Sequence, residues 1–247
     1  MASAKTTLKV VGTVPVPSTE VIDTETLLSK PENARERWND YGIGLLLQGD
    51  LKAAETAFLK VTKIEPTYLD GWVNVARVRI EEGDMPGAEA MLEKAFEIQK
   101  TLPPENPHRA KVHYFYALVQ ETGGNYDTAI EHLQHAAAQF PRDTRVRNKL
   151  GRMHFLKRNY ETALAEFQKT LTVDPEDLDA HYNMMRCYRA LKNPSLAAQS
   201  QKLYLRFKAD ESVDAITGIP RRADPDVNRE RQRIHEHTNS YEPLSNP

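Results

Sequence analysis

Two pairs of histidines are spaced so that they could bind a metal ion. His132 and His135 are three residues apart, which places both on one face of a helix, and His235 and His237 lie close together near the end of the chain. A zinc site in a protein normally has three or four protein ligands, and the sequence places no third ligand beside either pair. We therefore predict no metal site and expect surface histidines at both places.

Cys187 is the only cysteine, so no internal disulfide can form. Its neighbours Met184, Met185 and Tyr188 predict a small buried side chain rather than a reactive thiol. Nucleophilic catalysis would need a base beside it, and the sequence contains no Gly-rich phosphate loop, His-Glu-x-x-His motif or Gly-x-Ser-x-Gly motif. A Cys-x-x-Cys-His haem-attachment motif would need two cysteines. We therefore predict no enzymatic activity and no cofactor.

The composition is that of a globular chain with balanced charge. Hydrophobic residues make up 40% of the 247 residues, and 33 Lys and Arg stand against 35 Asp and Glu, for a formal net charge of -2. A nucleic-acid-binding protein would first show a basic face, so we predict no nucleic-acid partner. The sequence has no run of eighteen apolar residues, so we also predict no membrane insertion.

An internal repeat sets the position of the elements. Alanines recur at intervals of 34, 41, 34 and 34 residues, at Ala54, Ala88, Ala129, Ala163 and Ala197. Two further series keep this spacing: Gly42, Ala76, Ala117, Gly151 and Met185, and Phe58, Leu92, Leu133, Phe167 and Gln201. We infer five units of 34 residues, with seven residues inserted between the second and the third. The units are 35–68, 69–102, 110–143, 144–177 and 178–211.

Each unit contains two apolar runs of helical period with a short polar break between them. Breaks such as 48–50 and 123–125 contain Gly or Asn, which suit the left-handed conformation that ends a helix. Pro66, Pro141 and Pro175 stop the second helix in three units. The sequence therefore predicts an all-α chain of five helical hairpins. The inserted segment holds three prolines and either bends the stack or lengthens the helix before it.

The pattern resembles the tetratricopeptide repeat family, whose unit carries Trp, Leu-Gly, Tyr, Ala, Phe, Ala and Pro over 34 residues. The first unit matches at Trp38, Tyr41, Gly42, Leu45, Ala54, Phe58, Val61 and Pro66. The fifth departs most, with Gln201 and Tyr204 in apolar slots, and a terminal repeat needs a more polar outer face. The resemblance implies an α-solenoid over residues 35–211 that acts as a non-enzymatic scaffold and binds a protein or peptide.

In this family the first helices of successive hairpins line a concave groove that binds polypeptides. Carried over by register, the resemblance places the following residues there: Asn39 and Ile43 in the first unit; Val73, Asn74 and Arg77 in the second; Tyr114 and Leu118 in the third; Asn148, Arg152 and Phe155 in the fourth; and Tyr182, Asn183, Arg186 and Arg189 in the fifth. Asn amides can pair with a ligand's backbone, and Arg can bind carboxylates. We therefore expect a ligand with acidic residues toward the fourth and fifth units.

Some family members bind a free C-terminal carboxylate with a clamp of Lys, Asn and Arg. Asn74 and Lys111 occupy slots that such a clamp would use. Ile43 and Phe115, however, stand where the clamp needs polar residues, which argues against this mode of binding.

The two ends differ from the repeats. Residues 7–14 are rich in β-branched side chains and predict an extended, strand-like segment within residues 1–34, while residues 212–247 form a polar tail with several arginines. A single strand must pair with something. The alternative function is therefore a structural self-assembly module, an oligomer or filament in which these tails contact another copy of the chain.

Residues 37–50, 204–212 and 234–237 carry a narrower resemblance, to bacterial tetratricopeptide proteins. In some of these the repeats follow a multihaem cytochrome region, which implies a further alternative, a docking module of a bacterial envelope redox complex. Residues 1–11 lack the apolar core of a signal peptide. The compartment stays open between the bacterial cytoplasm and, for a processed chain, the periplasm or the extracellular space.

Overall fold

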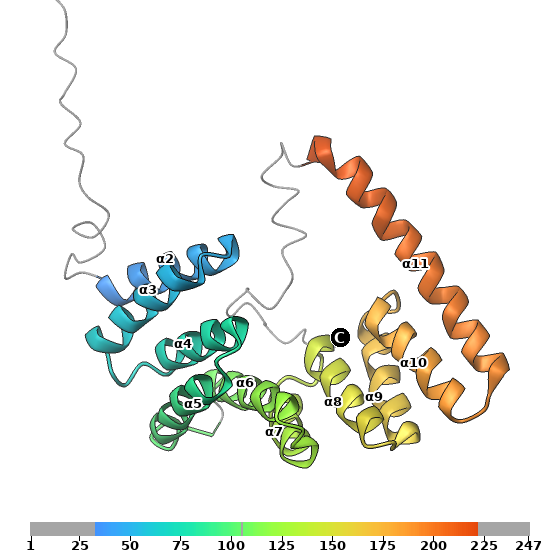
Figure 1. Cartoon of the computed structure of the whole chain (residues 1–247), viewed down its shortest axis with the longest axis horizontal. Helices are drawn as coiled ribbons and strands as arrows, with labels where there is room; N and C mark the ends of the chain where they lie inside the picture. The colour runs from blue at the N-terminus through green and yellow to red at the C-terminus, as the bar shows by residue number, and fades with distance from the viewer. Residues whose placement is uncertain (1–32, 105, 222–247) are drawn as a thin grey trace, which may run out of the picture.

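The computed structural model describes residues 33–104 and 106–221, and these fold into ten helices without a strand. The helices are α2 (Ala34–Gln48), α3 (Leu51–Ile64), α4 (Leu69–Glu82), α5 (Met85–Gln99), α6 (His108–Thr122), α7 (Tyr126–Gln139), α8 (Thr144–Leu156), α9 (Tyr160–Val173), α10 (Leu178–Ala190) and α11 (Pro194–Arg221). They form five consecutive hairpins that follow one another in a curved stack from α2–α3 to α10–α11 (Figure 1). The predicted α-solenoid is confirmed. None of the described helices is both long and apolar enough to cross a membrane.

The repeated small residues let the two helices of a hairpin approach closely. A Cβ atom on Gly42 would lie 2.6 Å from Cε1 of Phe58, and one on Gly151 would lie 2.7 Å from Cε1 of Phe167. Both phenylalanines are fully buried. The alanine series is also buried, at Ala54, Ala88, Ala129, Ala163 and Ala197. The 34-residue pattern therefore encodes the interior of each hairpin.

The predicted polar breaks end the first helix of each hairpin. Gly49, Gly83 and Gly124 have φ values of 81°, 85° and 77°, and Arg158 and Lys192 occupy the corresponding left-handed positions in the last two hairpins. Asp50 and Asp84 begin the second helices of the first two hairpins by accepting a hydrogen bond from a backbone N–H three residues ahead. These local signals fix where each helix turns back on its partner.

The inserted segment does not lengthen α5, which ends at Gln99. The chain after Gln99 connects α5 to α6, and the last two inserted residues, His108 and Arg109, begin α6. The guanidinium of Arg109 donates to the carbonyl oxygens of Gln99 and Leu102, at 2.9 and 3.0 Å. The side chain of Gln139 donates to the carbonyl oxygen of Asn106, at 2.6 Å. The connection is thus anchored to the helices on both sides of it.

The last helix, α11, continues to Arg221, ten residues beyond the predicted end of the fifth unit at residue 211. The predicted strand at residues 7–14 and most of the polar tail lie outside the described residues.

Candidate functional site

The predicted site residues lie on the first helices of the hairpins, α2, α4, α6, α8 and α10. We call the surface formed by these five helices the first-helix face. Each helix in the series contacts the next through polar or aromatic side chains, and the contacts run without a break from the first hairpin to the fifth. The face is therefore one connected surface rather than five separate ones.

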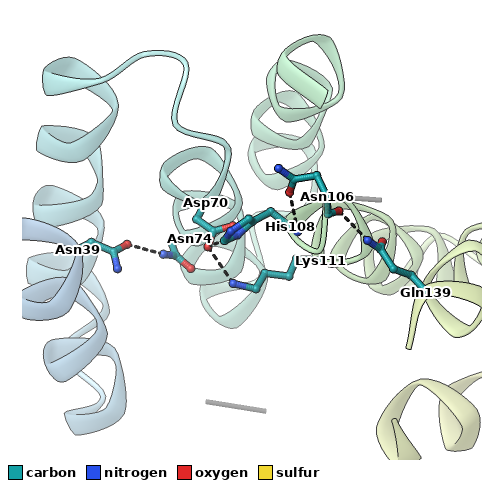
Figure 2. Close-up of polar contacts among 7 residues, drawn as sticks. All are labelled: Asn39, Asp70, Asn74, Asn106, His108, Lys111 and Gln139. Atoms are coloured by element: carbon teal, nitrogen blue, oxygen red, sulfur yellow. Dashed lines mark hydrogen bonds and ion pairs between the residues drawn. The ribbon is translucent and has the colours of Figure 1, made fainter. Parts of the chain in front are cut away.

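The first three helices are joined by an amide pair and by a buried carboxylate (Figure 2). The Asn74 side chain on α4 donates to Oδ1 of Asn39 on α2, at 2.9 Å. Asp70 on α4 accepts at its Oδ2 from His108 Nδ1 and from Lys111 Nζ on α6, both at 2.8 Å. The side chain of Asp70 is only 9% exposed. Burial would raise the pKa of Asp70, but hydrogen bonds from His108 and Lys111 and the charge on Lys111 outweigh it, so the pKa lies below its usual value.

The joint between α6 and α8 is also ionic. Glu121 on α6 accepts from Lys149 Nζ at 2.9 Å and lies 3.2 Å from Nε of Arg152, both on α8. The Glu121 side chain is 13% exposed, whereas Arg152 is 52% exposed. The Arg152 side chain therefore stays about half in solvent while its Nε contacts Glu121.

Aromatic rings and arginines meet where α8 packs against α10. The guanidinium of Arg186 lies 4.3 Å from the ring centroid of Phe155 and 5.7 Å from that of Tyr182. Tyr182 in turn lies 5.4 Å from the ring of Tyr204 on α11. Arg189 donates to the side chain of Gln201 at 2.8 Å. This end of the face is cationic, and stacking and hydrogen bonds hold its arginines in place.

Two of the predicted site residues, Val73 and Asn148, do not present a free side chain on the first-helix face. Val73 is 1% exposed and packs in the hydrophobic core, because it points inward from α4 while Asn74 beside it points to the face. The Asn148 amide donates to both carboxylate oxygens of Asp177, at 2.9 and 3.1 Å. Burial raises the pKa of Asp177 above its usual value. Val73 thus leaves the predicted set, and Asn148 joins α8 to the start of α10.

The remaining predicted residues are at least partly exposed. Tyr182 is among the exposed large hydrophobic residues, at 41%. Ile43, Phe115 and Phe155 are partly buried apolar side chains that pack against the core. Ile43 and Phe115 were the residues that argued against a carboxylate clamp, and their packing leaves no polar group at those two slots.

Asp70 and His108 belong to the contacts of the face but were not among the predicted site residues. Asp70 and Lys111 are 41 residues apart, so they occupy the same position in successive units. An acidic residue and a basic residue at the same position of successive units are a signal in the sequence that indicates this ion pair. Nothing comparable points to His108, since it lies in the insertion.

A second polar cluster lies on the other side of α6, between the second and third hairpins. Nδ1 of His113 on α6 lies 3.0 Å from Nδ1 of His132 on α7, and its Nε2 lies 3.1 Å from Nε2 of Gln99 on α5. His135 stacks on His113 with ring centroids 4.7 Å apart, and Phe96 meets His113 edge to face. Burial, and then the two other histidines, lower the pKa of His113 to about 4. Burial also lowers the pKa of His132.

The metal and thiol candidates have the following surroundings. His132 is half-buried in this cluster rather than on the open surface, and within the described residues no group of three or more His, Cys, Asp or Glu side chains could hold a metal ion. His235 and His237 lie outside the described residues. Cys187 is fully buried, as predicted, and burial raises its pKa to about 11.

Models of the tetratricopeptide repeat match residues 68–142, 117–172 and 148–212, which together cover more than half of the chain. The chain belongs to the tetratricopeptide repeat family. The matched residues run from the end of the first hairpin into α11. A search of curated proteins gives no match.

Solved tetratricopeptide structures have the same fold. MamA from Desulfovibrio magneticus RS-1 is 16% identical with a TM-score of 0.61, and the match covers 71% of this chain and 96% of that one. YrrB, described as "a TPR protein with an unusual peptide-binding site", is 19% identical with a TM-score of 0.57, covering 75% and 93%. PilF from Pseudomonas aeruginosa is 20% identical with a TM-score of 0.62, covering 70% and 76%. At these identities the likeness concerns the fold.

These findings support a protein-interaction scaffold. Self-assembly through the tails stays a prediction, because residues 1–32 and 222–247 lie outside the described residues. The association with a multihaem cytochrome region and the bacterial compartment also stay predictions.

Proposed function

We propose that this protein binds a polypeptide segment along the first-helix face, with the acidic residues of that segment toward α8 and α10. The observation that carries the proposal is the unbroken series of contacts that joins the five first helices and fixes partly exposed polar and aromatic side chains on one surface. Side chains already held in place lose little further freedom when a ligand binds, so more of the contact energy appears as affinity.

The α2–α4 end of the face suits a peptide backbone. The hydrogen bond between Asn74 and Asn39 uses one donor and one acceptor, and it leaves the Nδ2 group of Asn39 and the Oδ1 atom of Asn74 without a partner among the described residues. A backbone carbonyl could accept from the first, and a backbone N–H could donate to the second. An amide pair of this kind recognises the main chain without demanding a particular side chain.

The α8–α10 end suits carboxylates. Arg152 contacts Glu121, Arg186 donates to Oδ1 of Asn183 at 3.2 Å, and Arg189 donates to Gln201. Each guanidinium has five N–H donors, and these three arginines use only part of them. Phe155 and Tyr182 provide aromatic surface beside them. Aromatic and arginine side chains supply much of the energy at protein interfaces. A peptide that places Asp or Glu here would gain charge-assisted hydrogen bonds. The YrrB structure, whose description names a peptide-binding site, gives the proposal support by analogy of fold.

The test is a selection of random twelve-residue peptides displayed on phage against the immobilised protein. We expect enriched peptides to carry Asp or Glu and to bind at micromolar affinity, as judged by fluorescence anisotropy of the synthetic peptides. The triple variant Arg152→Glu, Arg186→Glu, Arg189→Glu should weaken binding by at least tenfold.

The matched control also reverses three positive charges, but on exposed lysines outside the first-helix face. Lys52, Lys63 and Lys202 lie on second helices and are exposed. Their replacement by Glu should leave peptide affinity within about twofold, because exposed charges at a distance are screened by salt. Equal loss in the two triple variants would reject the arginine end as the binding site.

A further inference from the structure

An open cleft of about 740 Å³ lies on the opposite side of the stack, between the second and third hairpins. Its walls come from Glu93, Lys94 and Glu97 on α5, and Phe96, Tyr116 and His132 complete it. Tyr116 lies about half a helical turn from Tyr114 and Leu118 around α6, so the cleft is separate from the first-helix face.

Packed aromatic rings form one side of the cleft. The ring of Phe96 lies 5.3 Å from that of Tyr116 and 5.5 Å from that of His132, both edge to face. The rings of Tyr116 and His132 lie 4.6 Å apart. Each ring is fixed by the other two, so the cleft presents a preformed aromatic surface. Such a surface attracts cations through the negative faces of its rings.

The charges around the rings are mainly negative. Glu93 and Glu97 are one helical turn apart on α5, and both are exposed. One turn before them, Glu89 accepts from the Tyr116 hydroxyl at 3.2 Å and from the Gln120 amide at 2.9 Å. The row of three carboxylates therefore follows the edge of the aromatic surface.

The cations nearby do not neutralise this row. Lys94 places its ammonium over the ring of Trp72, 4.7 Å from the centroid. Lys100 pairs with Glu97 at 2.6 Å, but the two side chains are 68% and 71% exposed, so a competing cation can replace this weak pair. Burial lowers the pKa of His132, so its imidazole is neutral near pH 7 and does not repel a cation.

We propose that this cleft binds an arginine side chain presented by a basic segment of a partner polypeptide. A planar guanidinium can stack on Tyr116 while its N–H groups donate to the carboxylates of Glu93 and Glu97. Arginine fits better than lysine because it can stack and form paired hydrogen bonds at the same time. The scaffold would then hold two polypeptides at once, an acidic one on the first-helix face and a basic one on the opposite side.

The test uses isothermal titration calorimetry with the peptide acetyl-Gly-Arg-Gly-Arg-Gly-amide at low ionic strength. The control peptide replaces each arginine by citrulline, which keeps the shape and removes the charge. We expect measurable binding of the arginine peptide and none of the citrulline peptide. The variant Glu93→Gln, Glu97→Gln should weaken binding by about fivefold.

The matched control removes two carboxylates from exposed positions outside the cleft, Glu161→Gln and Glu176→Gln, and should leave affinity unchanged. Amide resonances of residues 93–97, Tyr116 and His132 should shift on titration, while those of Asn39 and Asn74 should not. Equal binding of the two peptides, equal loss in the two double variants, or shifts centred on the first-helix face would each overturn the proposal.

Discussion

The interior of the hairpins and the joint between the second and third hairpins are built on different principles. Inside the first four hairpins, one pattern recurs: the first helix carries glycine or alanine where the second carries a large apolar side chain. Gly42 faces Phe58 in this way, and Gly151 faces Phe167. At the joint, a buried carboxylate bonded to a histidine and a lysine lies on one side of α6, and a histidine cluster lies on the other. The repeat thus specifies the hairpins, whereas polar residues particular to this chain specify how these two meet.

Substitution of two glycines in one helix should separate the hairpin interior from its surface. A Cβ atom at Gly42 would lie 2.6 Å from the buried Phe58 ring, whereas one at Gly44 would have nothing within 4 Å. We expect Gly42→Ala to lower the free energy of unfolding by about 2 kcal/mol through overpacking. Gly44→Ala should raise it by about 0.5–1 kcal/mol, because alanine loses less backbone entropy in a helix.

Urea denaturation followed by circular dichroism measures both variants, and the opposite signs are the decisive result. If both substitutions stabilised the protein, the close approach of α2 and α3 at Gly42 would be contradicted.

Substitution of Asp70 should test the ionic side of the joint. Asp70→Asn keeps the shape but removes the charge that pairs with His108 and Lys111, and we expect a loss of about 2 kcal/mol. The loss stays moderate because Lys111 is 41% exposed and can be hydrated. The control is Glu81→Gln, which removes an exposed pair with Arg77 and should cost less than about 0.5 kcal/mol.

A double-mutant cycle with Lys111→Met gives the coupling between Asp70 and Lys111. Coupling below about 0.5 kcal/mol would mean that the joint does not depend on this ion pair.

The same division decides what the sequence alone can predict. The alanine of the second helix recurs in every unit, and a small residue paired with a large apolar one recurs in the first four units. This spacing predicts the hairpins and their boundaries. Contacts between hairpins depend on side-chain direction. Val73 and Asn74 are adjacent in sequence, yet one is buried in the core and the other lies on the face. His108 lies in the insertion, where no repeat position applies, so its contact with Asp70 required the structure. The end of α11 at Arg221 also lies beyond the last repeat, so the repeat spacing does not predict it.

The histidine side of the joint should make stability depend on pH. The pKa of His113 falls from 6.5 to about 4 in the folded chain, where it contacts Gln99, Phe96, His132 and His135 and lies near the charge of Arg109. Between these values the unfolded chain binds more protons than the folded one, so stability falls as the pH is lowered from about 6.5 toward 4. Because His113 is only partly buried, we expect a loss of about 1 kcal/mol rather than the full value of the shift.

Urea denaturation at pH 7, 6, 5 and 4.5 measures this loss, and His113→Gln should remove most of it. The matched control is His154→Gln in the fourth hairpin, where burial also lowers the pKa but no second histidine adds to the effect. The His154→Gln variant should keep most of the pH dependence. His132 and His135 lower the pKa of His113 but have no such effect on His154. The same slope in both variants would place the pH sensitivity outside the joint, and the contrast between joint and hairpin interior would then rest on Asp70.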